Sequence, residues 1–257
     1  MVESNRYPLS EEMLRNLPKD ALVSFPVPDI PEITPGVNIG SLIVERMQGL
    51  GSVENGDIFV VASKIISKSE GQIVDLTKIT PSDEARKLHS TLGRKTPELI
   101  QLILDNSRSF AVQNGIILAK HRLGFVITSA GVDGLNDQSA IILPDDPDAS
   151  AHGIMDEIQT QTQKNVAIVI SDSEGRPDRQ GAGAISIGVA GIDPLRVREV
   201  KLENGKTKRT EETIADLLAA QASLTMGQRG NNIPIVCIRG FSYVFNSDAN
   251  LQSIIHP

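Results

Sequence analysis

The stretch Ile168-Val-Ile-Ser-Asp-Ser-Glu-Gly-Arg-Pro-Asp-Arg-Gln-Gly-Ala-Gly-Ala-Ile-Ser-Ile-Gly-Val-Ala-Gly191 carries the most information about the fold. The apolar run from Asn165 to Ile170 predicts a buried strand that stops at Ser171. A glycine-rich loop with two arginines follows, and a second apolar run begins after it. The pattern therefore predicts two buried strands joined by a polar loop.

The polar residues of this stretch point to a particular chemistry. Asp172 and Ser173 supply oxygen atoms at the predicted strand end, and oxygen is the ligand that Mg²⁺ and Mn²⁺ prefer. Arg176 and Arg179 lie among glycines, which lets guanidinium groups and backbone N–H groups approach a phosphate. A solvated surface loop is the alternative, but it explains the arginines and glycines less well. The stretch predicts metal-assisted chemistry on a phosphorylated ligand.

The composition limits the class of protein. With 257 residues, 40% of them apolar and 22% charged, the chain is expected to form one large globular domain or two interwoven lobes. Aromatic residues make up 3%, tryptophan is missing, and the net charge is −7. Nucleic-acid binding needs a basic surface, so these values argue against it, while a basic pocket for one nucleotide remains compatible.

Several features predict a cytoplasmic protein without membrane attachment. The single cysteine, Cys237, lies in an apolar run and is expected to be a small buried hydrophobe, so a disulfide framework is excluded. The first 20 residues are polar and contain no apolar core of a signal peptide. No apolar run is long enough to cross a bilayer.

The predicted elements mix strands and helices without strict alternation, which favours an α+β fold with a mixed sheet. Strands are expected over residues 21–27, 57–63, 115–120, 125–128, 165–170 and 233–239. Helices are expected over 39–48 and 150–163, after the capping residues Ser82 and Thr96, and from a cap at Thr210 to Gly227. Asn204-Gly205 predicts a hairpin over 196–210. Residues 1–20 are predicted to be an extension, 21–245 the domain, and 246–257 a tail.

Three other loops combine small residues with charges. Lys64 and Lys68 follow a predicted strand and could hold a phosphate, or they could be solvated lysines of a hairpin. In the loop from Thr128 to Asn136, Asp133 and Asn136 fit a cation and a ligand as well as they fit a plain Asx-type turn. The glycine loop from Met226 to Ile233 follows a helix end, where glycine often serves only the backbone. No loop matches a P-loop or a dinucleotide fingerprint, and the four histidines are scattered and treated as incidental: His89, His121, His152 and His256.

The ordered set of these motifs resembles the coenzyme F(420):L-glutamate ligase family. The matching pieces, spread over residues 21–245, are Phe25-Pro-Val27, Ile30-Pro-Glu-Ile33, Ser63-Lys-Ile-Ile-Ser-Lys-Ser-Glu-Gly71, Ser129-Ala-Gly-Val-Asp-Gly-Leu-Asn136, Ile170-Ser-Asp-Ser-Glu-Gly-Arg176, Ile187-Gly-Val-Ala-Gly191, Met226-Gly-Gln228 and Ile233-Pro-Ile-Val-Cys-Ile-Arg-Gly240. The resemblance implies an α+β fold of the F(420)-0:gamma-glutamyl ligase kind in an intertwined homodimer.

The resemblance also implies a role for individual residues. It implies two divalent cations, Mn²⁺ or Mg²⁺, bound by Asp133, Asp172, Ser173 and Gln228, with K⁺ as a further cation. It implies GTP contacts by Ile30, Pro31, Glu32, Ile33, Ser63, Lys64, Lys68, Asn136, Met226, Gly227, Gln228, Arg229, Gly230, Asn231, Asn232 and Ile233. Asp133, Asp172 and Arg176 are the expected catalytic residues.

The implied reaction joins the carboxylate of F(420)-0 to the amine of L-glutamate through an acyl phosphate, with GDP released. The chain departs from the family pattern at the charged hairpin Asp193–Arg209 and at Asp172-Ser-Glu-Gly175, which keeps a hydroxyl beside the aspartate. Two alternatives stay open: a ligase of the same fold acting on a pterin, folate or peptide-like carboxylate, and a non-catalytic protein that senses GTP or metal. Two retained metal carboxylates argue against the sensor.

Overall fold

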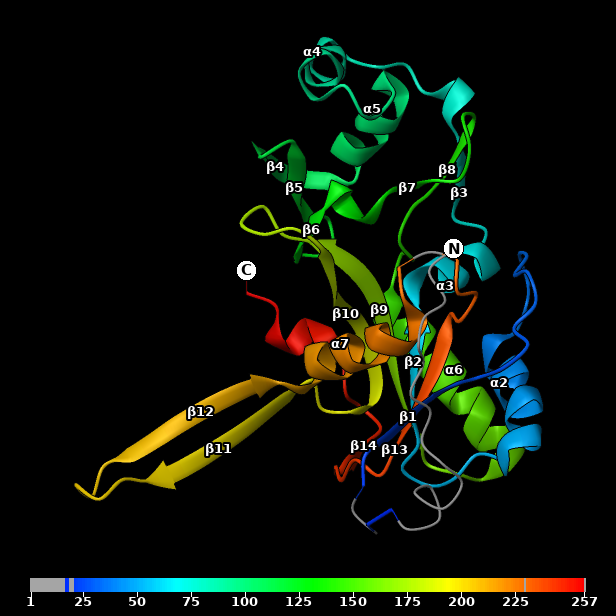
Figure 1. Cartoon of the computed structure of the whole chain (residues 1–257), viewed down its shortest axis with the longest axis vertical. Coiled ribbons are helices and arrows are strands. Elements are labelled where there is room, and N and C mark those ends of the chain that lie inside the picture. The colour runs from blue at the N-terminus through cyan, green and yellow to red at the C-terminus, as the bar shows by residue number, and fades with distance from the viewer. Residues whose placement is uncertain (1–16, 19–20, 229, 257) are drawn as a thin grey trace, which may run out of the picture.

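The computed structural model describes residues 17–18, 21–228 and 230–256. It confirms the predicted mixed α+β architecture, with a six-stranded mixed sheet at its centre (Figure 1). The strand order is β1 (Val23–Pro26), β13 (Ile235–Arg239), β2 (Ile58–Ala62), β9 (Ala167–Gly175), β10 (Ala182–Ile192) and β14 (Phe245–Asn246). β2 and β9 run parallel, and the other neighbouring pairs run antiparallel. The carboxyl ends of β2 and β9 therefore lie side by side.

Helices cover both faces of this sheet. They are α2 (Ile39–Met47) and α6 (Pro147–Thr162) on one face and α7 (Ile214–Met226) on the other. Phe59 and Val61 of β2 pack in the core that α2 and α6 share, whereas Ile58 and Val60 pack in the core of α7. Successive side chains of a strand point to opposite faces, so a strand covered on both sides is apolar at every position.

A second group of elements has its own core and occupies the upper part of Figure 1. It contains β3 (Ile73–Asp75), α4 (Asp83–Leu92), α5 (Pro97–Asp105), β4 (Ser107–Gln113), β5 (Ile116–His121), β6 (Val126–Thr128), β7 (Asp133–Gly134) and β8 (Ser139–Ile141). Ser82 and Thr96 cap α4 and α5 as predicted, because each side chain accepts a hydrogen bond from the backbone three residues on. The chain enters this part after α3 (Ser63–Ser69) and returns to the central sheet through α6.

The predicted hairpin is present as an arm that projects from the body (Figure 1). It consists of β11 (Leu195–Lys201) and β12 (Thr207–Thr213), joined at Asn204-Gly205, where Gly205 has a φ of 76°. The predicted helix cap at Thr210 is wrong, since Thr210 lies inside β12 and pairs with Arg198 of β11. Cross-strand pairing holds the segment extended as far as Thr213, and α7 starts after it.

The structure corrects three further boundaries. Strand β9 does not stop at Ser171 but continues to Gly175, because β10 pairs with it over the whole polar stretch, Ser173 opposite Ala184. Residues 64–68 form neither a strand nor a hairpin but belong to helix α3. Helix α6 starts at Pro147 instead of residue 150, capped by Asp146.

The C-terminal segment, predicted as a tail, contains defined elements that pack on the sheet. β14 pairs with β10, and Leu251 in the short 3₁₀ helix Leu251–Ile254 is buried. The buried carboxylate of Asp148 accepts hydrogen bonds from the backbone N–H groups of Val189 and Leu251, at 2.8 and 2.9 Å. Such charge-assisted contacts attach the segment to the sheet.

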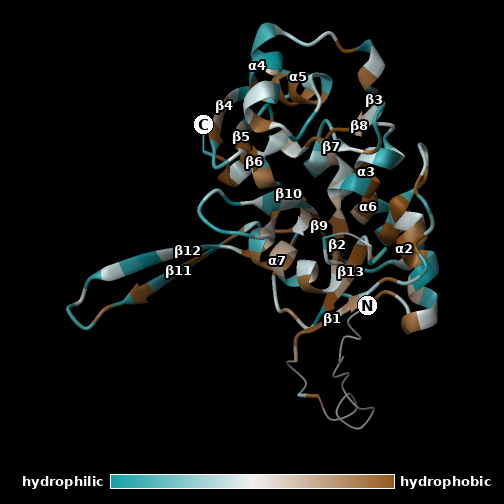
Figure 2. Ribbon diagram, turned by 45° about the horizontal axis from the view of Figure 1, so that its top comes forward, coloured by the Kyte–Doolittle hydropathy of each residue, from teal (hydrophilic) through white to brown (hydrophobic). Residues whose placement is uncertain are grey.

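The expectation that the histidines are incidental is wrong for His121. Its side chain is 1% exposed and stacks on the ring of Phe125, with the ring centroids 5.4 Å apart. Figure 2 shows polar residues on the outer surface of α4, both polar and apolar residues along the arm, and mostly apolar residues in the central strands β1, β2 and β13. Within the described residues, no helix combines the length and the hydropathy needed to cross a membrane. Most of the predicted extension over residues 1–20 lies outside the described residues.

Candidate functional site

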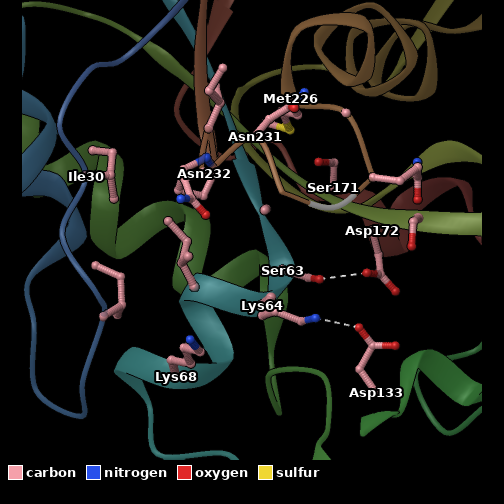
Figure 3. Close-up of a pocket in the computed structure, with 18 of the residues that line it drawn as sticks. Ile30, Ser63, Lys64, Lys68, Asp133, Ser171, Asp172, Met226, Asn231 and Asn232 are labelled. Atoms are coloured by element: carbon pink, nitrogen blue, oxygen red, sulfur yellow. Dashed lines mark hydrogen bonds and ion pairs between the residues drawn. The ribbon is translucent and has the colours of Figure 1, made fainter. Parts of the chain in front are cut away.

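A cavity of about 660 Å³ opens where the ends of β2 and β9 meet β7 and the end of α7 (Figure 3). Most residues predicted for the site line it: Ile30, Pro31, Glu32, Ile33, Ser63, Lys64, Lys68, Asp133, Asp172, Ser173, Met226, Gly227, Gln228, Gly230, Asn231, Asn232 and Ile233. Residues from five separate segments of the chain thus converge on one cavity.

The junction of β2 and α3 supplies Ser63 and Lys64. Ala62 pairs with Ser171 in the parallel β2–β9 ladder, so the residues that follow Ala62 and Ser171 emerge at the same edge of the sheet. The Ser63 hydroxyl is buried and donates a hydrogen bond to Oδ1 of Asp172 at 2.8 Å. Lys64 points to the other carboxylate, with its Nζ 2.6 Å from Oδ2 of Asp133 (Figure 3).

Asp172 lies in an environment that disfavours its charge. Its pKa is raised to about 6, chiefly by burial and also by the negative charge of Asp133. The hydrogen bond from Ser63 and the charge of Lys64 act in the opposite direction. Two carboxylates placed together in a partly desolvated cavity leave a negative charge that a cation can neutralise.

Asp133 is directed into the cavity by an unusual turn. Ser129, Ala130 and Gly131 have φ values of 55°, 49° and 65°, so three consecutive residues lie in the left-handed region. A Cβ on Gly131 would lie 2.5 Å from the side chain of Leu143, so this position needs glycine for space as well as for conformation. Backbone strain of this kind is found at sites where a side chain must be held in one direction.

The loop after α7 forms another wall of the cavity. Gly227 ends the helix with a φ of 66°, and its N–H donates to the carbonyl of Ser223 at 2.9 Å. A Cβ on Gly227 would lie 2.4 Å from the Asn231 side-chain amide, so this glycine provides the room in which Asn231 packs. Arg229, predicted as a nucleotide contact, lies outside the described residues.

The segment from Ile30 to Ile33 closes the cavity beside α3. Its Glu32 forms an ion pair with Lys68, one helical turn after Lys64. Figure 3 shows Lys68 on the side of α3 turned away from Asp133 and Asp172. The two lysines therefore face different anionic partners, although they share a helix.

Two predicted site residues do not line the cavity. Asn136 forms the local Asx-type turn, since its Oδ1 accepts a hydrogen bond from the backbone of Gln138 at 2.9 Å. Arg176 lies in the turn between β9 and β10, beyond the part of β9 that lines the cavity. Its charge acts on Glu174, whose pKa is raised by burial and lowered by Arg176.

The cavity wall also includes residues that the sequence analysis missed: Ala62, Ile65, Gly134, Leu135, Ser171, Ala184, Ser223 and Pro234. Ser171 and Pro234 flank predicted site residues and could have been included on that ground. Ala184 enters the wall because it pairs with Ser173, a register that no local signal reveals. Ser223 lies one turn before the glycine at the end of α7 and is visible only once the helix is placed.

The side chains present fit a hard divalent cation. Asp133 and Asp172 offer carboxylates, and Ser173 and Gln228 line the same cavity with a hydroxyl and an amide. Among the described residues, no three histidine, cysteine, aspartate or glutamate side chains gather into a metal-binding cluster. This donor set suits Mg²⁺ or Mn²⁺, which are commonly bound by one or two carboxylates and complete their coordination with phosphate oxygens and water.

Comparison with known proteins shows the family of the chain. The model of the F(420)-0:gamma-glutamyl ligase family matches residues 29–240. The coenzyme F(420):L-glutamate ligase of Methanothermobacter thermautotrophicus is 38% identical over 238 residues, which cover 90% of this chain and 94% of that protein. The ligases of Methanocaldococcus jannaschii (42% identical, 86% and 88% covered) and Archaeoglobus fulgidus (34% identical, 85% and 87% covered) bear the same name. The chain belongs to the F(420)-0:gamma-glutamyl ligase family.

Proposed function

We propose that this protein is a GTP-dependent ligase that forms an amide bond between the carboxylate of F(420)-0 and the amine of L-glutamate. The convergence of Lys64, Asp133 and Asp172 in one cavity is the observation that carries this proposal, because it joins a phosphate-binding cation to two metal-binding carboxylates. The names of the relatives support the choice of substrates.

The nucleotide is assigned to the cavity between α3 and the loop after α7. Lys64 and Lys68 act as point charges on the phosphates, and the backbone of the 226–233 loop lies against the nucleoside. Charge-assisted hydrogen bonds to phosphate contribute about 1.5–3 kcal/mol each when well formed. Asn136 reaches the nucleotide only if the turn that it forms with Gln138 opens.

Asp133, Asp172, Ser173 and Gln228 would hold the divalent cations, Mn²⁺ or Mg²⁺, of which we assign two to each site, with K⁺ as an additional cation. When bound, these ions neutralise charge on the transferred phosphoryl group. Ser63 keeps the Asp172 carboxylate oriented toward the cavity.

The reaction proceeds in two displacements. A carboxylate oxygen of F(420)-0 attacks the γ-phosphorus of GTP, the bond to the β–γ bridging oxygen breaks, and GDP leaves. The amine of glutamate then attacks the carbonyl carbon of the acyl phosphate, phosphate leaves, and a proton passes from the nitrogen to solvent. Positioning and charge neutralisation dominate such transfers, so the site needs neither cysteine nor histidine. Arg176 is assigned to the charge that develops at the phosphoryl group.

The decisive experiment is a reconstitution with GTP, Mn²⁺, K⁺, L-glutamate and F(420)-0, followed by mass spectrometry. A product heavier by one or more glutamyl units, with an equivalent amount of GDP, is expected. GTP binding without a glutamylated product would contradict the assigned acceptor. GDP release that depends on an added pterin, folate or peptide-like carboxylate would move the assignment to that acceptor.

We also propose that the protein acts in the cytoplasm as a homodimer in which the arm contacts the second copy. An isolated two-stranded sheet is only marginally stable in water. The arm nevertheless carries three exposed apolar residues, Val197, Val200 and Leu202, of which Val200 is 51% exposed. Burying them against another copy would stabilise both the arm and the dimer.

A further inference from the structure

We propose that Lys64 exchanges anionic partners, holding the carboxylate of Asp133 when the site is free of nucleotide and a phosphate group when nucleotide is bound. Nucleotide binding thereby releases Asp133 for a divalent cation and couples the two ligands. The inference rests on the proposed function, because it takes the nucleotide and cation from there. It adds a property of Lys64 that does not follow from a role as a plain phosphate contact.

The ion pair between Lys64 and Asp133 occupies a carboxylate that is also a proposed metal ligand. The Nζ of Lys64 lies 2.6 Å from Oδ2 of Asp133, an ion-pair contact that uses an oxygen of the carboxylate (Figure 3). Lys64 comes from α3 beside the central sheet, whereas Asp133 comes from β7 in the other group of elements. The ion pair therefore joins the two walls of the cavity.

The second carboxylate is held differently. Ser63 donates its hydroxyl hydrogen to Oδ1 of Asp172 at 2.8 Å. A neutral hydroxyl does not repel an incoming cation, whereas an ammonium group does. Of the two carboxylates, only Asp133 is therefore paired with an ammonium group that an arriving cation must displace.

The strength of the Lys64–Asp133 pair suits an exchange. The side chains are 43% and 49% exposed, and ion pairs with such exposure are weak because water screens them. Lysine carries its charge on a flexible four-carbon stem, so Nζ can move to a nearby phosphate without a change in the backbone. A phosphate with two negative charges competes well with a single carboxylate.

Lys68 is a matched control. It lies on the same helix, lines the same cavity and also forms an ion pair, but its partner is Glu32, which is not among the proposed metal ligands. Loss of either lysine should weaken nucleotide binding. Only the loss of Lys64 should change the binding of a cation in the absence of nucleotide.

The test is a titration of the full-length, nucleotide-free protein with Mn²⁺, followed through the electron paramagnetic resonance signal of the free ion. In Lys64→Met, the Mn²⁺ dissociation constant should fall about two- to fivefold, the range typical of exposed ion pairs. Lys64→Arg and Lys68→Met should bind Mn²⁺ like the wild type. A non-hydrolysable GTP analogue should tighten Mn²⁺ binding less in Lys64→Met than in the wild type, because the coupling is reciprocal.

Thermal melts identify any misfolded variant, and Lys64→Gln repeats the test if Lys64→Met proves misfolded. If the wild type binds Mn²⁺ and the analogue but Lys64→Met binds Mn²⁺ no more tightly, the exchange is refuted and the proposed function stands. If the wild type binds neither ligand, the proposed function fails and the exchange fails with it.

Discussion

At the residue scale, the proposed role of Asp172 as a metal ligand depends on its charge. Asp172 combines a partly buried carboxylate with a hydrogen bond from Ser63. Asp172→Asn keeps an oxygen that can accept this hydrogen bond but removes the charge that is proposed to hold a cation. We expect the variant to fold normally and to lose ligation by at least about a hundredfold, measured as GDP release together with Mn²⁺ affinity.

Asp178→Asn is the control for this substitution. Asp178 lies in the turn that follows β9, is exposed, and pairs with Arg179 outside the cavity. Its replacement should leave turnover close to that of the wild type. Full turnover by Asp172→Asn would remove Asp172 from the metal site.

His121 makes the stability of the fold depend on pH. Its pKa is lowered from 6.5 to about 4, chiefly by burial and also by the positive charges of Arg122 and Arg108. The folded protein therefore favours the neutral ring, while the unfolded chain takes up a proton near pH 6.5. The stabilisation is complete above pH 6.5 and is lost as the pH falls toward 4, by roughly 2–3 kcal/mol.

His121→Asn tests this origin. The asparagine oxygen can still accept the hydrogen bond that Leu123 N–H donates to Nδ1 at 3.1 Å, but the side chain does not titrate. Between pH 7 and 4.5, urea unfolding should show a smaller loss of stability for the variant than for the wild type. Equal losses would place the acid sensitivity elsewhere.

At the scale of elements, the left-handed turn Ser129–Gly131 aims Asp133 at the cavity. Gly131→Ala should cost about 2–4 kcal/mol, the sum of backbone strain and overlap with buried Leu143. Gly115→Ala is a matched control, because Gly115 has a φ of 75° and open space around its Cα.

Gly115→Ala should cost only about 1–2 kcal/mol, the strain term alone. Urea unfolding of both variants, with Mn²⁺ affinity as a second measurement, separates strain from overlap. Gly131→Ala should also weaken Mn²⁺ binding, which Gly115→Ala should not. Equal effects of the two variants would mean that the turn has no part in holding Asp133.

At the scale of the whole molecule, the arm projects from the body as a separate two-stranded sheet. Removing residues 199–209 and joining Arg198 to Thr210 through Asn-Gly keeps a paired hairpin base, because these two residues face each other in the register. The shortened protein should fold and should be a monomer by light scattering. A shortened protein that remains a dimer would place the interface elsewhere.

Much of the local structure followed from short-range signals. The caps at Ser82 and Thr96, the Asn204-Gly205 turn and the glycine after α7 are where the sequence predicted them. The errors arose where pairing overrode local preference, as at Thr210, whose strand partner Arg198 lies across the hairpin. Propensity describes what a segment favours alone, and partners in the fold decide the outcome.

The mixed α+β class and the polar loops were readable from the amino-acid order, because hydrophobic spacing, capping residues and charged loops act over a few positions of the chain. The roles of the individual loop residues were predicted from the family resemblance. The assembly of the site was decided only in three dimensions. Ser63 and Asp172 lie 109 positions apart in the sequence. They meet because β2 and β9, which are both buried on two faces, pair as parallel neighbours in the central sheet. Asn136, in contrast, satisfies its own turn at short range and stays outside the cavity.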